Sequence, residues 1–206
     1  MKTEETKNFH EFHNHVFGDY RYYAYNGLSE DVCTCLEGIE RIKAEKLVLQ
    51  SIKKIILDER AIRAAGYLRL QTAVPLLEKR LDGKNLFMRQ NVHSSIVWAL
   101  LKIKSKKEYL DKLINVVNNG SKLDGLTRPD AANFLSDFGK ELSAINTLLG
   151  AFLDDDIFVS ASALYALRKI FRNNVDVSNL LNDMSFASSS QERNSIVKQA
   201  ERHVSV

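Results

Sequence analysis

Leucines recur along this chain at almost equal intervals, and this regularity constrains the fold more than any other feature. Consecutive members are separated by 32, 32, 35 and 32 residues, and an apolar, mostly small residue stands three positions before each. A short helical pair cannot bury its apolar surface alone, so a repeat of this length predicts helical pairs stacked on one another. The leucines are Leu36, Leu68, Leu100, Leu135 and Leu167, preceded by Cys33, Ala65, Val97, Ala132 and Leu164; a second series, Leu81, Val117 and Leu153, is always followed by Asp or Asn.

The best-preserved copy runs from Asp58 to Asp82 and predicts two amphipathic helices joined by a turn. Thr72 is expected to cap the second helix with its hydroxyl. Pro75 is expected to occupy the first turn of this helix, where a backbone N–H has no partner within the helix, so its absence costs no hydrogen bond. Gly66 is expected to let a neighbouring helix approach closely. The residues that step by three or four along a helix face are Ile62, Ala65, Leu68 and Arg69, then Val74, Leu77 and Leu81.

The composition favours an all-α, soluble protein. The 206 residues are 45% hydrophobic and include only two prolines, which suits a helical chain with a substantial core. No window approaches the ~18 consecutive apolar residues of a membrane span, and the acidic N-terminus resembles no targeting peptide. Cys33 and Cys35 are two residues apart on a predicted helix and point in different directions, so they make a poor disulfide, which together with their small number fits a reducing compartment. The expected location is therefore the cytoplasm, with no membrane association.

The chain is expected to form one domain, 1–206, with three parts. Residues 1–28 are rich in histidine and tyrosine and predict an atypical N-terminal cap, residues 29–173 hold the repeats, and residues 174–206 predict a helical C-terminal cap. Several helix boundaries are marked by capping signals. They are Ser29, a boundary near Lys43, Ser105 to Glu108, Thr127 with Pro129, a left-handed Gly139, the run Asp154 to Asp156, and Ser189 to Glu192.

Three pieces of the chain resemble HEAT repeats, in particular the short repeats first described in phycobilin lyases. They read RAIRAAGYLRLQTAVPLLEKRLD, RPDAANFLSDFGKELSAINTLLGAFLDDD and VSASALYALRKI. The resemblance covers about Ser29 to Arg172. It implies a right-handed α-α superhelix, a HEAT-like solenoid of about four to five helical hairpins, whose second helices line a concave face that commonly binds protein.

A binding surface on that concave face follows from aligning the second helices. The residues two positions before the aligned apolar residues, Lys54, Lys79, Asn115 and Ala151, form the expected row. Tyrosines are enriched at interfaces, so part of the run Tyr20, Tyr22, Tyr23 and Tyr25 is expected to join this surface and part to pack against the first repeat. The expected function is a non-enzymatic protein–protein interaction module, as an adaptor, scaffold or inhibitor; an immunity protein for a toxin is one biological setting.

Two alternatives come from the same resemblance. Lys104, Lys106 and Lys107 could grip phosphates, as in HEAT-like DNA glycosylases, although cations near a helix C-terminus are ordinary and the net charge of +3 is small. A phycobilin-lyase-like enzyme would rest on fold alone. Trp98 stands on an apolar face and is expected in the core.

The histidines His10, His13 and His15 are the remaining candidate site. His10 and His13 are three residues apart and could share a helix face as metal ligands, but amphipathic histidines of the cap are the preferred interpretation, and no metal or other cofactor is expected. No glycine-rich phosphate loop, Ser-His-acid arrangement or spaced cysteine set supports an enzyme. The sequence leaves the partner and the oligomeric state open.

Overall fold

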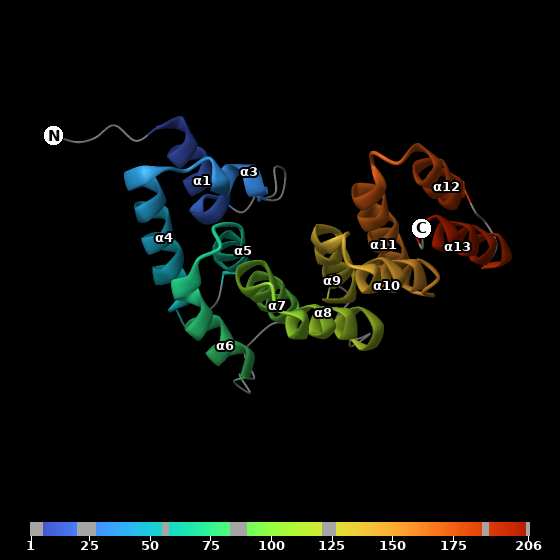
Figure 1. Cartoon of the computed structure of the whole chain (residues 1–206). Helices are drawn as coiled ribbons and strands as arrows, with labels where there is room; N and C mark the ends of the chain where they lie inside the picture. Colours follow the sequence, from blue (N-terminus) through green and yellow to red (C-terminus); the bar gives the residue numbers. More distant parts are fainter. Residues whose placement is uncertain are drawn as a thin grey trace. The chain divides into compact units, whose positions relative to one another are not determined.

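The structure, a computed structural model, is entirely α-helical in the residues it describes, as expected. These are residues 6–19, 28–54, 58–82, 90–120, 127–186 and 190–204, which contain twelve α-helices, two short 3-10 helices and no strand. The chain divides into two compact units, Met1–Tyr109 and Leu110–Val206. Each unit is described by itself (Figure 1).

In the described part of unit 1, three helices precede the best-preserved repeat. They are α1 (Lys7–Phe17), α3 (Glu30–Thr34) and α4 (Gly38–Ile52). The boundary expected near Lys43 is wrong, because the break comes at residues 35–37, where Leu36 is buried and Gly38 takes a positive φ of 50°. Ser29 does occupy the N-cap of α3, but its side chain makes no capping bond.

The central repeat forms α5 (Glu59–Tyr67), the 3-10 turn η1 (Gln71–Ala73) and α6 (Val74–Asp82). Asp58 caps α5 by accepting a bond from the Arg60 amide, and Pro75 lies in the first turn of α6 as predicted. Thr72 is not a cap, because it lies within η1. Arg69 also leaves the predicted helix face: it has a φ of 49°, is exposed, and lies beyond the end of α5.

The next helix, α7 (Gln90–Lys104), packs against α5 and also against α6. Gly66 allows this approach, since a Cβ there would lie 2.6 Å from Cζ3 of Trp98 and 3.1 Å from the Cα of Ala99. Trp98 is fully buried, as expected for a core residue. Ser105 does not open a capping box: its φ of 51° belongs to the end of α7, and α8 (Lys107–Asn119) starts two residues later.

Unit 2 is built around α9 (Thr127–Leu135), the 3-10 turn η2 (Ser136–Phe138), α10 (Leu142–Phe152) and α11 (Ile157–Phe171). Helix α11 packs against both α9 and α10. Thr127 is the first residue of α9 rather than its cap. Gly139 is not left-handed, with a φ of −66°; its small size matters instead, because a Cβ would lie 2.6 Å from Cγ1 of Ile170.

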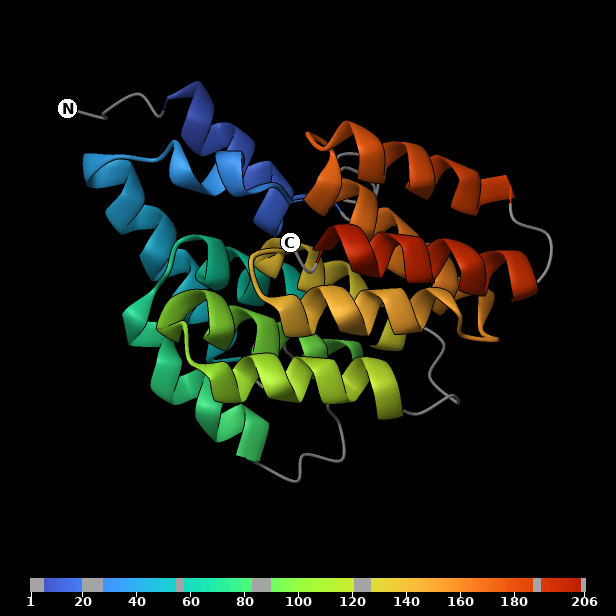
Figure 2. The ribbon, with the colours of Figure 1, turned by 45° about the vertical axis from the view of Figure 1, so that its right-hand side comes forward.

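The C-terminal segment forms two further helices, α12 (Val175–Phe186) and α13 (Ser190–Val204). Figure 2 shows α13 between α10 and α12, and it contacts both. Val197 and Ala200 are buried there, in agreement with the predicted last helix. Ser189, its expected cap, lies outside the described residues. No helix in the described part of the chain is long and apolar enough to cross a membrane.

Candidate protein-binding surface

One side of α11 carries apolar side chains that no helix in the described ranges covers. Asp156 starts the helix by accepting a bond from the Phe158 amide at 2.9 Å. With 3.6 residues per turn, the residues at positions 157, 158, 161 and 165 lie along one side of the helix. We call Ile157, Phe158, Ala161 and Tyr165 the α11 strip; Ile157 is 74% exposed, Phe158 67% and Tyr165 65%.

The opposite side of α11 is an ordinary core face. It contributes fully buried residues to the contacts with α9 and α10, so the helix does not need its strip in order to pack. The buried residues are Val159, Ser160, Ala163, Ala166 and Leu167. Exposed apolar residues are common when scattered, but a row of them along one helix is typical of an interaction site.

Opposite charges mark the two ends of the strip. Asp155 precedes the helix and is exposed, while Arg168 and Lys169 lie exposed in the last turns. Lys169 pairs with Asp137 at 2.7 Å, and an Arg168 nitrogen lies 3.4 Å from Oδ1 of Asn182. An exposed aspartate therefore lies next to the start of the apolar strip, and two basic residues lie next to its end.

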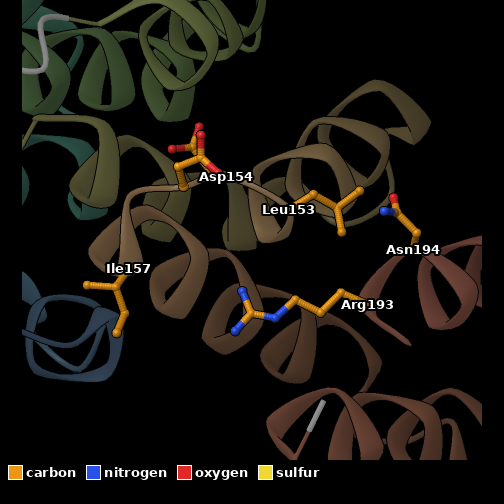
Figure 3. A pocket seen from close by; sticks show the side chains of 6 residues that line it. Leu153, Asp154, Ile157, Arg193 and Asn194 are labelled. Carbon is orange, nitrogen blue, oxygen red and sulfur yellow. The ribbon is translucent and has the colours of Figure 1, made fainter. Parts of the chain in front are cut away.

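A pocket of about 310 Å³ lies beside the start of the strip. Figure 3 shows the Arg193 side chain extending from α13 across the pocket toward Ile157, with Leu153 above it. The Arg193 guanidinium also lies 5.6 Å from the centroid of the Phe152 ring. The lining residues are Leu153, Asp154, Asp155, Ile157, Arg193 and Asn194.

A buried arginine fixes the loop that forms this pocket. Arg128, which is only 6% exposed, donates from Nε to the Val117 carbonyl at 2.7 Å and from Nη1 to Oδ1 of Asp154 at 3.2 Å, and its Nη2 bonds the other carboxylate oxygen. Asp154 in turn accepts a bond from the Asp156 amide at 3.0 Å. This network ties the end of α8 and the start of α9 to the α10–α11 loop.

The predicted row on the second helices is only partly at the surface. Lys54, Lys79 and Asn115 are exposed, although Lys54 lies beyond the end of α4. Ala151 is 6% exposed, so its place in the row is wrong. The alignment on Leu153 is one residue off, because Phe152 is the buried residue at that point and Gly150 is the exposed one two positions before it.

The candidate residues at the N-terminus have different outcomes. Tyr20, Tyr22, Tyr23 and Tyr25 lie outside the described residues. His10 and His13 are exposed on α1, whereas His15 is buried, and the His13 ring lies 5.6 Å from that of Phe17. Within the described ranges, no group of three His, Cys, Asp or Glu side chains is arranged to hold a metal ion.

Of the three candidate phosphate-binding lysines, Lys104, Lys106 and Lys107, the first makes side-chain contacts inside unit 1. Lys104 bonds Oε1 of Glu78 at 2.6 Å, and the Tyr109 hydroxyl donates to the same oxygen at 2.7 Å. These two bonds lower the pKa of Glu78, and the bond to Glu78 raises the pKa of Lys104. Burial, followed by the bond to Glu78, raises the pKa of Tyr109 to about 12. Lys106 and Lys107 remain exposed.

The two cysteines have very different surroundings. Cys33 is fully buried in α3, and this burial raises the pKa of its thiol to about 12. Cys35 is exposed. A thiol that stays protonated at neutral pH is a poor nucleophile and a poor metal ligand, so Cys33 has the character of a core residue.

Sequence reasoning did not single out the α11 strip or the pocket. The apolar spacing of Ile157, Ala161 and Tyr165 resembles that of any core-facing helix side, so it carried no separate signal. Arg193 stands in a segment expected only to cap the array. Comparison of the chain with protein-family models, with curated proteins and with solved structures finds no match in any of the three.

Proposed function

We propose that this protein is a non-enzymatic protein-binding module that holds its partner on the α11 strip and the adjoining pocket. The observation that carries this proposal is the exposure of Ile157, Phe158 and Tyr165 on one side of a helix whose other side is well packed. Large apolar and aromatic side chains that stay exposed to water provide contact area at an interface.

The dimensions and chemistry of the pocket support a protein partner. Its volume of about 310 Å³ is at the small end of the range for small-molecule sites. It opens beside Ile157, next to two carboxylates and a guanidinium, which is the mixture of apolar anchor and polar rim found in protein interfaces. The pocket is large enough to admit one side chain of a partner.

Two groups that could act as nucleophiles are poorly suited to that role. Catalytic nucleophiles need lowered pKa values, whereas the pKa values of the Cys33 thiol and the Tyr109 phenol are both raised to about 12. Each of these groups is better suited to packing or hydrogen bonding than to attack on a substrate.

A HEAT-like solenoid is part of the same proposal. Consecutive first helices pack on one another within each unit, α3 on α5 and α5 on α7 in unit 1, and α9 on α11 in unit 2. The leucine series follows these helices, and in an array of this kind each repeat contacts only its neighbours.

Site-specific photo-crosslinking tests the proposal against the predicted row of second helices. A benzophenone side chain at position 165 is expected to trap a polypeptide, which mass spectrometry identifies and which is then purified and titrated against the chain. Phe158→Ser should weaken that binding at least about tenfold, as loss of an aromatic hot spot does. Probes at Lys79 and Asn115 serve as controls. Crosslinks at these two positions alone would show that the row binds instead, and absence of any crosslinked polypeptide would refute the proposal.

A further inference from the structure

We infer that the partner of the α11 strip is the same strip of a second copy of this chain, bound antiparallel about a twofold axis. The inference rests on the proposed function, because it names the occupant of the same surface. It comes from the order of charges along α11 and from the position of the smallest residue in the strip.

The charge order makes the strip complementary to itself. Asp155 stands at one end and Arg168 at the other, with the apolar residues between them. When two such helices run antiparallel, each acidic end faces a basic end, whereas a parallel pair would bring like charges together. A surface that matches itself under a twofold rotation is the requirement for an isologous dimer.

Ala161 lies at the centre of the strip, four residues after Ile157 and four before Tyr165. A twofold axis beside Ala161 therefore places Tyr165 of one copy against Ile157 and Phe158 of the other. The same axis brings Arg168 close to Asp155 of the second copy. The short side chain of Ala161 lets the two helices approach closely at the crossing point.

The pocket provides a place for the Tyr165 ring of the second copy. It lies beside Ile157, where the twofold arrangement brings that ring, and its volume of about 310 Å³ is large enough to admit one aromatic side chain. The exposed Asp155 carboxylate in its lining can accept a bond from the phenol hydroxyl. Tyrosine is among the residues that contribute most to interfaces when the ring enters a pocket.

The expected dimer is weak. The 15 residues of α11 extend over about 22 Å, so a contact along this helix buries less than the ~1,200 Å² that is the lower limit of standard interfaces. We therefore expect a monomer–dimer equilibrium with a dissociation constant on the order of micromolar.

Sedimentation equilibrium of the full chain, with two single charge reversals, tests this inference. Arg168→Glu makes both ends of the strip acidic, and Asp155→Lys makes both ends basic. Each variant alone should dimerise at least about tenfold more weakly than the wild type, because like charges then meet. An equimolar mixture of the two variants should recover dimerisation, since acidic ends again face basic ends. Lys79→Glu, on α6, is the matched control and should leave dimerisation unchanged.

Three outcomes would overturn the inference: a monomer throughout the micromolar range, a dimer insensitive to both reversals, or a mixture no stronger than its components. Circular dichroism of each variant shows whether it is folded, and Phe158→Ser provides a second route to the same surface if Arg168→Glu unfolds. The crosslinking at position 165 separates this inference from the proposed function. A trapped foreign polypeptide refutes self-association but supports the proposed function. A crosslink within one chain refutes both.

Discussion

Trp98 and Tyr165 occupy the same place in two repeats but have opposite environments. Each stands two residues before a leucine of the repeat series, Leu100 in α7 and Leu167 in α11. Trp98 is fully buried and its ring lies 4.9 Å from that of Tyr67, edge to face, whereas Tyr165 is 65% exposed. The position of an aromatic residue in the repeat therefore does not by itself decide whether its side chain is buried.

The preceding first helices, α5 and α9, differ at one aligned position, and this difference offers an explanation. Gly66 of α5 leaves room for the Trp98 ring. The matching position in α9, two residues before Leu135, is Asn133, whose Oδ1 is buried with no hydrogen-bond partner in the described structure. A side chain at this point fills the space that the glycine leaves, so the aromatic residue of α11 is expected to turn outward.

Removing the buried aromatic should have the largest effect. Trp98→Ala is expected to lower the free energy of unfolding by about 4 kcal/mol, because it deletes a large, fully buried side chain and leaves a cavity. Since Trp98 is the only tryptophan, urea unfolding has to be followed by circular dichroism rather than fluorescence. A loss below 1 kcal/mol would mean that α5 and α7 do not depend on this contact.

Unit 2 relies on the buried ion pair between Arg128 and Asp154. Arg128→Met keeps most of the side-chain volume but leaves the Asp154 carboxylate and the Val117 carbonyl without this donor. We expect a loss of about 3 kcal/mol, at the low end for a broken buried pair because the Asp154 side chain is 20% exposed. The same urea titration measures it. Arg128→Lys, which keeps the charge but not the fork of donors, should recover only part of the loss.

Alkaline pH should destabilise unit 1 through a group that unit 2 lacks. The Cys33 thiol keeps its proton in the folded chain to a pH of about 12, whereas in the unfolded chain it ionises near 9.0. The unfolded state therefore releases a proton first, so stability falls as pH rises through this window, by up to about 1.4 kcal/mol per pH unit. The free energy of unfolding, measured in buffers between pH 8 and 10, should fall less steeply with pH in Cys33→Ala than in the wild type. Equal slopes would contradict the assignment.

The glycine contact predicts a smaller change with a built-in control. Gly66→Ala brings a Cβ against the Trp98 ring and the α7 backbone, and the strain should exceed the gain in helix propensity, for a net loss of about 1 kcal/mol. Asn133→Ala is the matched change in α9 and removes a buried amide oxygen that has no partner, so it should be neutral or stabilising. Thermal unfolding of both variants measures the contrast, and equal destabilisation would reject the explanation for the two aromatic positions.

The helical class and the core positions could be predicted from the sequence because they depend on spacing. The leucines of the series and Gly66 were placed correctly, since an apolar period and a small residue act locally. The capping box predicted at Ser105 is wrong, because Ser105 takes a positive φ just after the end of α7, two residues before α8 begins. The α11 strip could not be predicted, because Ile157 and Tyr165 have the pattern of buried residues and only the arrangement of α9, α10 and α12 leaves them uncovered.

The smallest expected effect on stability is also the one that separates packing from binding. Tyr165→Ala should change the free energy of unfolding by no more than about 0.5 kcal/mol, because the ring is largely in water and the buried face of α11 is untouched. The same variant should lose the binding activity of the α11 strip, which sedimentation detects. Trp98→Phe is a useful counterpart, since it disturbs the core while leaving the strip intact. If Tyr165→Ala instead unfolds the chain as Trp98→Ala does, the tyrosine is a packing residue and the contrast between the two repeats is false.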